Sequence, residues 1–188
     1  MMKYTARLLA VLFAASTILV ACDKDDDMND MNPDEPTLYE RVGGDAMVQD
    51  PNNPGQQIEQ GYLTLRAVVD SAIFVIAADP QLQPYFETLL MEVGNGNLTG
   101  FTILSKNLTD FFAVATGSES YNYTGLSMKD AHDPAQNPRM AMKSNDADFD
   151  QFIADVAVSL DQNGVTDQEL IGDLIALIET IHADVVQR

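Results

Sequence analysis

The spacing of apolar residues in the C-terminal part of the chain is that of helices. From residue 149 to residue 160 the apolar side chains recur every three or four positions, at Phe149, Phe152, Ile153, Val156 and Leu160. They therefore share one face of a helix. Gly164 should end this helix, because glycine readily adopts the left-handed backbone that follows a helix. Thr166 and Glu169 then have the spacing of a capping box, which predicts that a second helix begins there.

Three more stretches are consistent with an all-α domain. After Glu169 the apolar residues again lie on one helical face: Leu170, Leu174, Ile175, Ile178, Ile181 and Val185. Upstream, LRAVVDSAIFVIAADP is apolar enough for a central helix, which Pro80 should end. A further helix is expected from about residue 103 to residue 116, closed by Gly117, and its inward side chains are Leu104, Leu108, Phe111, Phe112 and Ala115. No strand pattern of comparable quality is found.

The N-terminal residues have the order of an export signal. Lys3 and Arg7 precede the run LLAVLFAASTILVA, which ends at Cys22. The run is shorter than the roughly 20 apolar residues of a membrane-spanning helix. LVAC resembles the lipobox of bacterial lipoproteins, in which the cysteine carries lipid. We therefore expect a signal peptide over residues 1–21 and lipid on Cys22, with an unmodified thiol as the alternative.

The segment after Cys22 predicts a tether. Residues 22–36 are acidic, contain two prolines and have no apolar periodicity, so they cannot bury enough surface to order themselves. The remaining residues, 37–188, are enough for one domain with a ligand cavity. The net charge of −19 disfavours nucleic acid and anionic lipid headgroups as partners. A lipid-anchored location in the cell envelope, periplasmic or surface-exposed, follows from the leader.

Two stretches of the domain interrupt the helical patterns. QDPNNPGQQIEQG and MEVGNGNLTG are rich in Asn, Gly and Pro. These residue types favour turns, so both stretches are predicted to be surface loops.

The order of short motifs along the domain resembles that of the truncated haemoglobins, particularly group I. The motifs are LYERVGG, VVD, ADPQLQPYF, LTDFFAVATGS, YTG, MKDAH, FDQF and NGV. The resemblance covers nearly all of residues 37–188, with the two loops as insertions. It implies a truncated-globin fold, in which helices form a two-over-two sandwich, with haem b as cofactor and a diatomic gas (O₂, CO or NO) as ligand.

The resemblance also assigns the residues of a haem site. His132, in MKDAH, stands at the position of the proximal iron ligand, and a neutral imidazole is a suitable nitrogen donor to haem iron. A surface histidine on a short polar helix is the alternative. His182 is expected to be a solvated residue of the last helix. The other residues assigned to haem binding are Ile73, Phe86, Leu104, Leu108, Phe112, Tyr123, Leu126 and Met128. Phe86 should be buried whether or not it contacts haem.

At two of these positions the chain departs from the family. Family members usually carry a tyrosine on the central helix and a glutamine on the distal helix, where this chain has Ile73 and Leu108. Bound O₂ is polar, and a donor stabilises it by about 1.5–3 kcal/mol, so its loss should speed O₂ release roughly ten- to a hundredfold. CO and NO depend less on such a bond. Only a donor from elsewhere, such as Tyr62 or Thr102, would change this expectation.

These features bear on three classes of function. The first is a haem-binding globin that binds or senses a diatomic gas, or performs slow redox chemistry such as NO dioxygenation. The second is a haem-less globin-fold interaction or sensor module, which the missing distal pair makes conceivable. A conventional enzyme finds no support, because no nucleophile with a paired base, metal cluster or phosphate-binding loop is recognisable.

Overall fold

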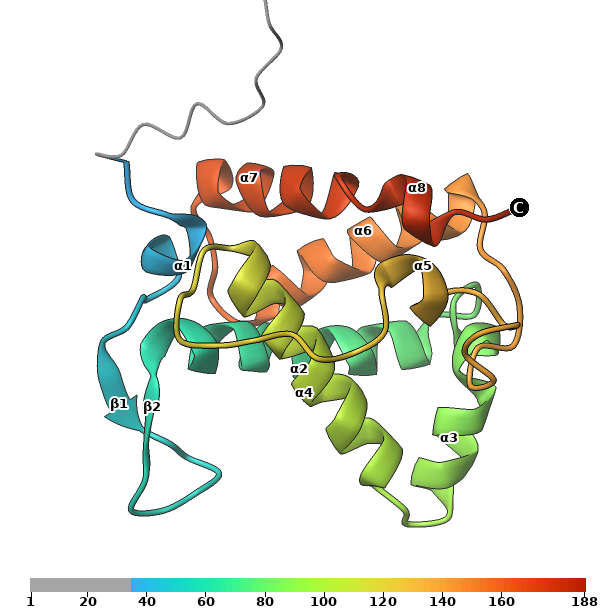
Figure 1. The fold of residues 1–188 in the computed structure, drawn as a ribbon, viewed down its shortest axis with the longest axis horizontal. Coiled ribbons are helices and arrows are strands. Elements are labelled where there is room, and N and C mark those ends of the chain that lie inside the picture. Colours follow the sequence, from blue (N-terminus) through green and yellow to red (C-terminus); the bar gives the residue numbers. More distant parts are fainter. Residues whose placement is uncertain (1–34) are drawn as a thin grey trace, which may run out of the picture. The chain divides into compact units, whose positions relative to one another are not determined.

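A computed structural model describes residues 35–188 (Figure 1). The predicted signal peptide, Cys22 and nearly all of the tether lie outside these residues. The helices are α1 (Leu38–Arg41), α2 (Gln60–Ala78), α3 (Glu87–Gly94), α4 (Thr99–Ala115), α5 (Met128–Ala131), α6 (Asp146–Gln162), α7 (Gln168–Glu179) and α8 (His182–Val185). A 3-10 helix, η1 (Gln83–Phe86), precedes α3.

The central helix α2 organises the domain. It packs on α6 and on α4, which crosses it in Figure 1. Its sequence would be long and apolar enough to cross a membrane, but a buried core helix has the same composition, and α2 is packed as one. It ends at Ala78, before Pro80, as the sequence predicts. Except for one short hairpin, the fold is all-α, as the sequence predicts.

The C-terminal helices follow the predicted apolar faces, but one predicted cap is wrong. α6 ends two residues before Gly164, whose φ of 74° is the left-handed conformation expected there. α7 is capped by Asp167, whose carboxylate accepts from the backbone N–H groups of Glu169 and Leu170. Thr166 therefore does not form the predicted capping box, because the aspartate one residue later already satisfies these N–H groups. The last predicted helix is interrupted at Thr180 and Ile181, so that α7 and α8 are separate helices.

Both predicted loops contain regular structure. The first holds an antiparallel hairpin of β1 (Met47–Gln49) and β2 (Gln57–Glu59), with Val48 opposite Ile58. Strands of three residues are too short to give a clear alternating pattern, which is why the sequence did not predict them. In the second loop, α3 continues to Gly94 and α4 begins at Thr99. The true loop is therefore only residues 95–98.

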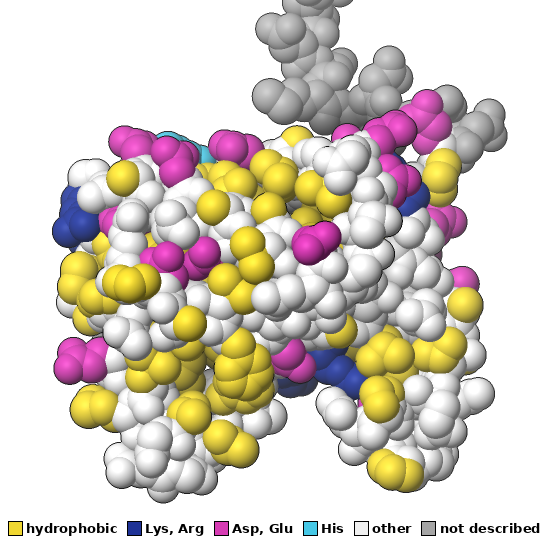
Figure 2. Space-filling model, turned by 180° about the vertical axis from the view of Figure 1, so that it is seen from behind, with side chains coloured by type: hydrophobic (Ala, Val, Ile, Leu, Met, Phe, Trp, Pro, Cys, Tyr) yellow, Lys and Arg dark blue, Asp and Glu magenta, His cyan; other side chains and the backbone are white. Residues whose placement is uncertain are grey.

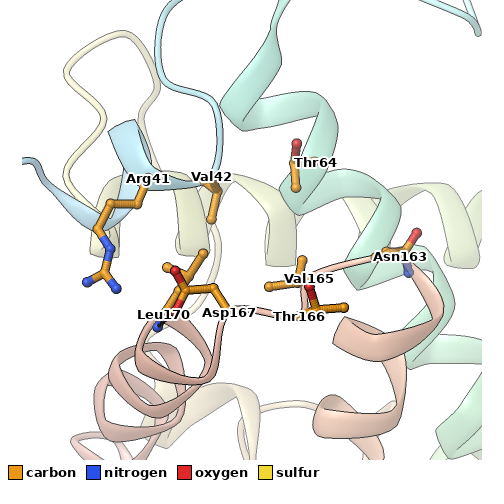
Figure 3. Close-up of a pocket in the computed structure, with 9 residues that line it drawn as sticks. Arg41, Val42, Thr64, Asn163, Val165, Thr166, Asp167 and Leu170 are labelled. Atoms are coloured by element: carbon orange, nitrogen blue, oxygen red, sulfur yellow. Dashed lines mark hydrogen bonds between the residues drawn. The ribbon is translucent and has the colours of Figure 1, made fainter.

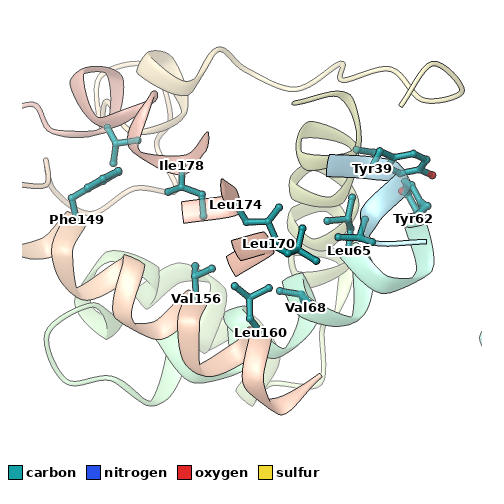
Figure 4. Close-up of a cluster of buried hydrophobic side chains, with 13 residues drawn as sticks. Tyr39, Tyr62, Leu65, Val68, Phe149, Val156, Leu160, Leu170, Leu174 and Ile178 are labelled. Carbon is teal, nitrogen blue, oxygen red and sulfur yellow. The ribbon is translucent and has the colours of Figure 1, made fainter. Parts of the chain in front are cut away.

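The buried apolar side chains form three clusters. The large core joins α1, α2, α4, α6, α7 and α8, and Figure 4 shows some of its side chains meeting, among them Leu65, Leu160 and Leu174. A second group, called here the α2–α4 cluster, has as its buried members Val69, Ile73 and Leu89. A third cluster consists of Ile76, Leu82 and Tyr85. On the face seen in Figure 2, apolar patches lie between scattered acidic side chains.

Candidate functional site

His132 is held at the C-terminal end of α5. This short helix begins at Ser127, whose hydroxyl accepts from the backbone N–H of Asp130 (3.1 Å). One turn later, the His132 Nδ1 lies 2.7 Å from the carbonyl oxygen of Met128. A carbonyl can only accept, so Nδ1 carries the proton and donates it. In the neutral ring, Nε2 then keeps its lone pair, and among residues 35–188 no group forms a hydrogen bond with it.

The surroundings keep this imidazole neutral. Burial lowers the pKa of His132 below its usual range, while the Met128 carbonyl and the charge of Asp184 oppose that shift. A neutral imidazole is the form that binds metals. No group of three or more His, Cys, Asp or Glu side chains is placed to hold a metal ion in the described part of the chain. A metal at His132 would therefore have to bring most of its ligands with it, as a haem does.

Two contacts from outside the helix fix α5. The side-chain amide of Gln187 donates to the carbonyl of Lys129 (2.8 Å), and that of Asn137 donates to the carbonyl of Ala131 (2.8 Å). α5 also packs on α8. These contacts position the backbone around His132 independently of the α2–α4 cluster.

The α2–α4 cluster contains five of the side chains assigned to haem binding. Ile73 is buried in it, and the partly buried members are Phe86, Val93, Phe101, Leu104, Leu108 and Phe112. All nine members of the cluster are apolar. Six of them keep part of their surface uncovered, so the cluster is an apolar surface rather than a closed core.

The remaining assigned residues lie on the segment between α4 and α5. Tyr123 touches Phe111 edge-on (ring centroids 5.6 Å apart), and its hydroxyl donates to the carbonyl of Leu126 (2.5 Å). The Leu126 side chain is 48% exposed, and Met128 is half-buried. Phe111 in turn meets Phe112 of the α2–α4 cluster edge-on at 5.4 Å, so Tyr123 is linked to that cluster through one ring.

One expectation about burial needs correction. Phe86 is only half-buried, and it packs against both the α2–α4 cluster and the third cluster. The His182 side chain is 40% exposed, as expected, but its Nε2 also lies 3.0 Å from a carboxylate oxygen of Asp146, and its ring meets that of Phe149 edge-on at 4.8 Å. These contacts give His182 a structural role at the surface of the large core.

Two clefts were not predicted from the sequence. One, of about 280 Å³, lies between α1 and the α6–α7 turn; in Figure 3 the Arg41 guanidinium at its edge points away from Thr64 and Asn163. That guanidinium is 2.5 Å from Asp173 and is thus already paired. The other, of about 530 Å³, is lined by Gln83, Pro84, Glu87, Leu90 and Met91. Neither cleft includes His132. Their linings include residues of the LYERVGG, NGV and ADPQLQPYF motifs, which resemble those of the family but did not predict a cleft.

Comparisons with known proteins find similarity to truncated haemoglobins, both in sequence and in structure. A group 1 truncated haemoglobin from Tetrahymena thermophila is 25% identical over 150 residues, which is 80% of this chain and 94% of that protein. Solved structures of three variants of the truncated haemoglobin from Tetrahymena pyriformis, in the Fe(III) form, match with a TM-score of 0.58 and 24% identity. Each match covers 81% of this chain and 100% of the solved one. No protein-family model matches the chain.

The structural comparison and the sequence comparison therefore point to the same family. The described domain has the truncated-globin fold, and its similarity to a group 1 member over most of both chains supports its place in the truncated haemoglobin family.

Proposed function

We propose that the domain binds haem through Nε2 of His132 and binds a diatomic gas on the apolar side formed by the α2–α4 cluster. The observation that carries this proposal is the 2.7 Å hydrogen bond between His132 Nδ1 and the Met128 carbonyl. It fixes the tautomer and the ring orientation, so that a neutral nitrogen is left as a ligand. The similarity to a group 1 protein supports a group I-like assignment.

The residues present fit this cofactor. When bound, haem would supply an iron that can coordinate a diatomic gas, and the protein would have to supply a ligand to that iron and apolar surroundings for the ring. His132 supplies the ligand. Phe86, Leu104, Leu108 and Phe112 have apolar surface still uncovered, and they would exclude water from the ring. The single cysteine of the chain is Cys22, so the domain cannot form the cysteine linkages of a c-type haem, and haem b is the form proposed.

Absorption spectroscopy tests this function. Purified protein with added haem should show a Soret band that shifts on reduction and on addition of CO. His132→Ala should lose stable haem uptake, and His132→Gly should regain it when free imidazole is added. His182→Ala is the matched control and should bind haem normally, because His182 pairs with Asp146 instead. No Soret band in the unmodified protein would favour the haem-less module.

We also propose that lipid on Cys22 anchors the protein in the cell envelope. LVAC, the apolar run before it and the polar segment after it support this location. Cys22→Ala should prevent labelling with a fatty acid and release the protein from the membrane fraction. Labelling and membrane association that persist in this variant would overturn the proposal without affecting the haem site.

A further inference from the structure

We infer that the gas-binding side of this site has no hydrogen-bond donor. The protein therefore releases O₂ quickly, whereas its release of CO and NO is little affected. The inference rests on the proposed function, since it concerns the ligand side of the same haem. It assigns ligand selectivity to Ile73 and Leu108.

The first step is the apolar lining itself. Ile73 is 8% exposed and packs in the same cluster as Leu104 and Leu108, which lie one turn apart on α4. Phe101 and Phe112 extend the same face of the helix. No side chain of this face can donate a hydrogen bond.

The second step concerns the hydroxyl groups on the rest of α4. Three of the four have their proton engaged elsewhere: Ser105 donates to Asp70 (2.5 Å), Thr109 to the carbonyl of Ser105 (2.7 Å) and Thr102 to the carbonyl of Leu98 (3.0 Å). The fourth, Thr99, is exposed at the first position of the helix. Thr102 is also exposed. It therefore does not serve as the donor considered from the sequence.

The third step concerns the tyrosines near the cluster. Tyr62 donates to the buried carboxylate of Asp110 (2.8 Å), and its ring stacks on Tyr121 at 4.0 Å. Moving Tyr62 towards a ligand would leave Asp110, which is 3% exposed, without this partner. The Tyr123 hydroxyl is likewise engaged with the Leu126 carbonyl. Both phenols are therefore committed within the protein.

One polar side chain on α4 provides a sharp test of this inference. Asn107 is half-buried, and no hydrogen bond of its amide is found within residues 35–188. It follows Leu104 by three residues, on the side of Leu104 away from Leu108, so it lies at the edge of the apolar face. The Asn107 amide is therefore a candidate donor to a bound ligand, because no described contact engages it.

The chemistry then sets the selectivity. Bound O₂ develops partial negative charge and is stabilised by a donor, whereas CO and NO gain much less from one. Without a donor, O₂ release should be roughly ten- to a hundredfold faster than with one. CO release should change little.

The experiment compares the unmodified protein with the double variant Ile73→Tyr, Leu108→Gln. Stopped-flow dissociation should show O₂ release slowed about ten- to a hundredfold in the variant and CO release changed by only a small factor. The infrared stretching band of CO, which does not depend on turnover, should move to lower frequency when the donors are present. Ile73→Phe, Leu108→Met is the apolar control: it adds bulk without a donor, so any change in release should affect O₂ and CO alike. If the double variant does not take up haem, Leu108→Gln alone serves the same comparison.

Slow O₂ release in the unmodified protein, equal to that of the double variant, would overturn the inference. If Asn107→Leu then accelerates that release, the Asn107 amide is the donor. A protein that binds no haem at all overturns the proposed function as well. Haem uptake with slow O₂ release overturns the selectivity alone.

Discussion

The large core and the α2–α4 cluster are both apolar, but they differ in how completely they are closed. In the large core, Ala113 is 0% and Phe149 is 1% exposed. Of the members of the large core, 13 of 23 are buried, whereas in the α2–α4 cluster only three of nine are. A closed core gains stability from every atom that it buries, whereas an open apolar surface gains it only when something covers it. The difference separates the part that stabilises the fold from the part that is available to a ligand.

The largest effect is expected from truncation in the closed region. Phe149→Ala should lower the free energy of unfolding by about 3–5 kcal/mol, because it leaves a cavity in the large core where the ring packs. Phe101→Ala in the α2–α4 cluster should cost about 1–2 kcal/mol in the haem-free protein, since a half-buried ring loses fewer contacts. Urea denaturation of both variants measures this. Equal losses would remove the distinction between the two regions.

A charged group that supports α6 should give a smaller effect that depends on pH. Asp148 accepts hydrogen bonds from Tyr85 (2.5 Å), Arg188 (3.0 Å) and the Asn145 backbone (3.0 Å). Burial acts to raise the pKa of Asp148, but these partners and Gln81 together hold it below its usual range. Asp148→Ala should cost roughly 1.5–3 kcal/mol at pH 7.

The sign of this pH dependence follows from the lowered pKa. The stabilisation by Asp148 is fully present above about pH 4, the ordinary value for an aspartate, and is lost as pH falls through the lower folded-state pKa. Unfolding curves at pH 7 and pH 3 should therefore converge for the unmodified protein and Asp148→Ala. A difference that persists undiminished at pH 3 would contradict this role.

Asp155, also on α6, should have the opposite sign. Its Oδ1 accepts from Gln151 (3.1 Å), but its buried Oδ2 has no partner among the described residues. Burial raises the pKa of Asp155, and the Asp79 charge adds to that, against the Gln151 bond. The ionised form is thus disfavoured in the folded state, so stability is lost as pH rises from about 4 through the raised pKa.

Asp155→Asn should therefore stabilise the protein by about 1 kcal/mol at pH 7, because the amide cannot ionise. At pH 3 the gain should vanish. Thermal unfolding at both pH values measures it, with Asp150→Asn at the exposed surface of the same helix as control. A variant less stable than the parent at pH 7 would show that the carboxylate is needed in its ionised form.

The smallest effect on the haem-free protein is expected in the α2–α4 cluster. Leu104→Ala should lower its stability by only about 0.5–1 kcal/mol, because the side chain is partly uncovered before a ligand is present. The same substitution should accelerate haem loss several-fold, which transfer of haem to an apo-globin acceptor measures. Stability reduced as much as by Phe149→Ala would mean that Leu104 belongs to a closed core.

The sequence predicted α2, α6 and α7 well because each has a wide apolar face. For α4 the predicted inward face was wrong: Ser105, Thr109, Asp110 and Ala113 are buried against the rest of the domain, whereas the side chains expected to point inward are only partly buried, namely Leu104, Leu108, Phe111, Phe112 and Ala115. α6 and α2 were placed by such faces, and Gly164 and Pro80 marked their ends. The hairpin could not be predicted, since three-residue strands give too little pattern. The cap at Asp167 depended on which of two neighbouring polar residues takes the helix N-terminus, and both types are suitable.

The candidate site was predictable to different degrees. The spacing of Met128 and His132 is that of a carbonyl and a side chain one helical turn apart, so their hydrogen bond could have been anticipated. The engagement of Tyr62 could not, because its partner Asp110 is 48 positions away in the sequence. Sequence alone could name possible donors, and only the packing showed that they were already committed.

The acceptor that orients His132 is part of the main chain, and this affects how the protein can vary. Because the Met128 carbonyl belongs to the backbone, replacing the Met128 side chain leaves the hydrogen bond in place as long as α5 forms. The orientation of the imidazole is thus protected from most single-residue changes around it. Ile73 and Leu108, on other helices, can be exchanged without touching it. Under the proposed function, gas selectivity could therefore diverge among related proteins while the attachment of haem to His132 stays the same.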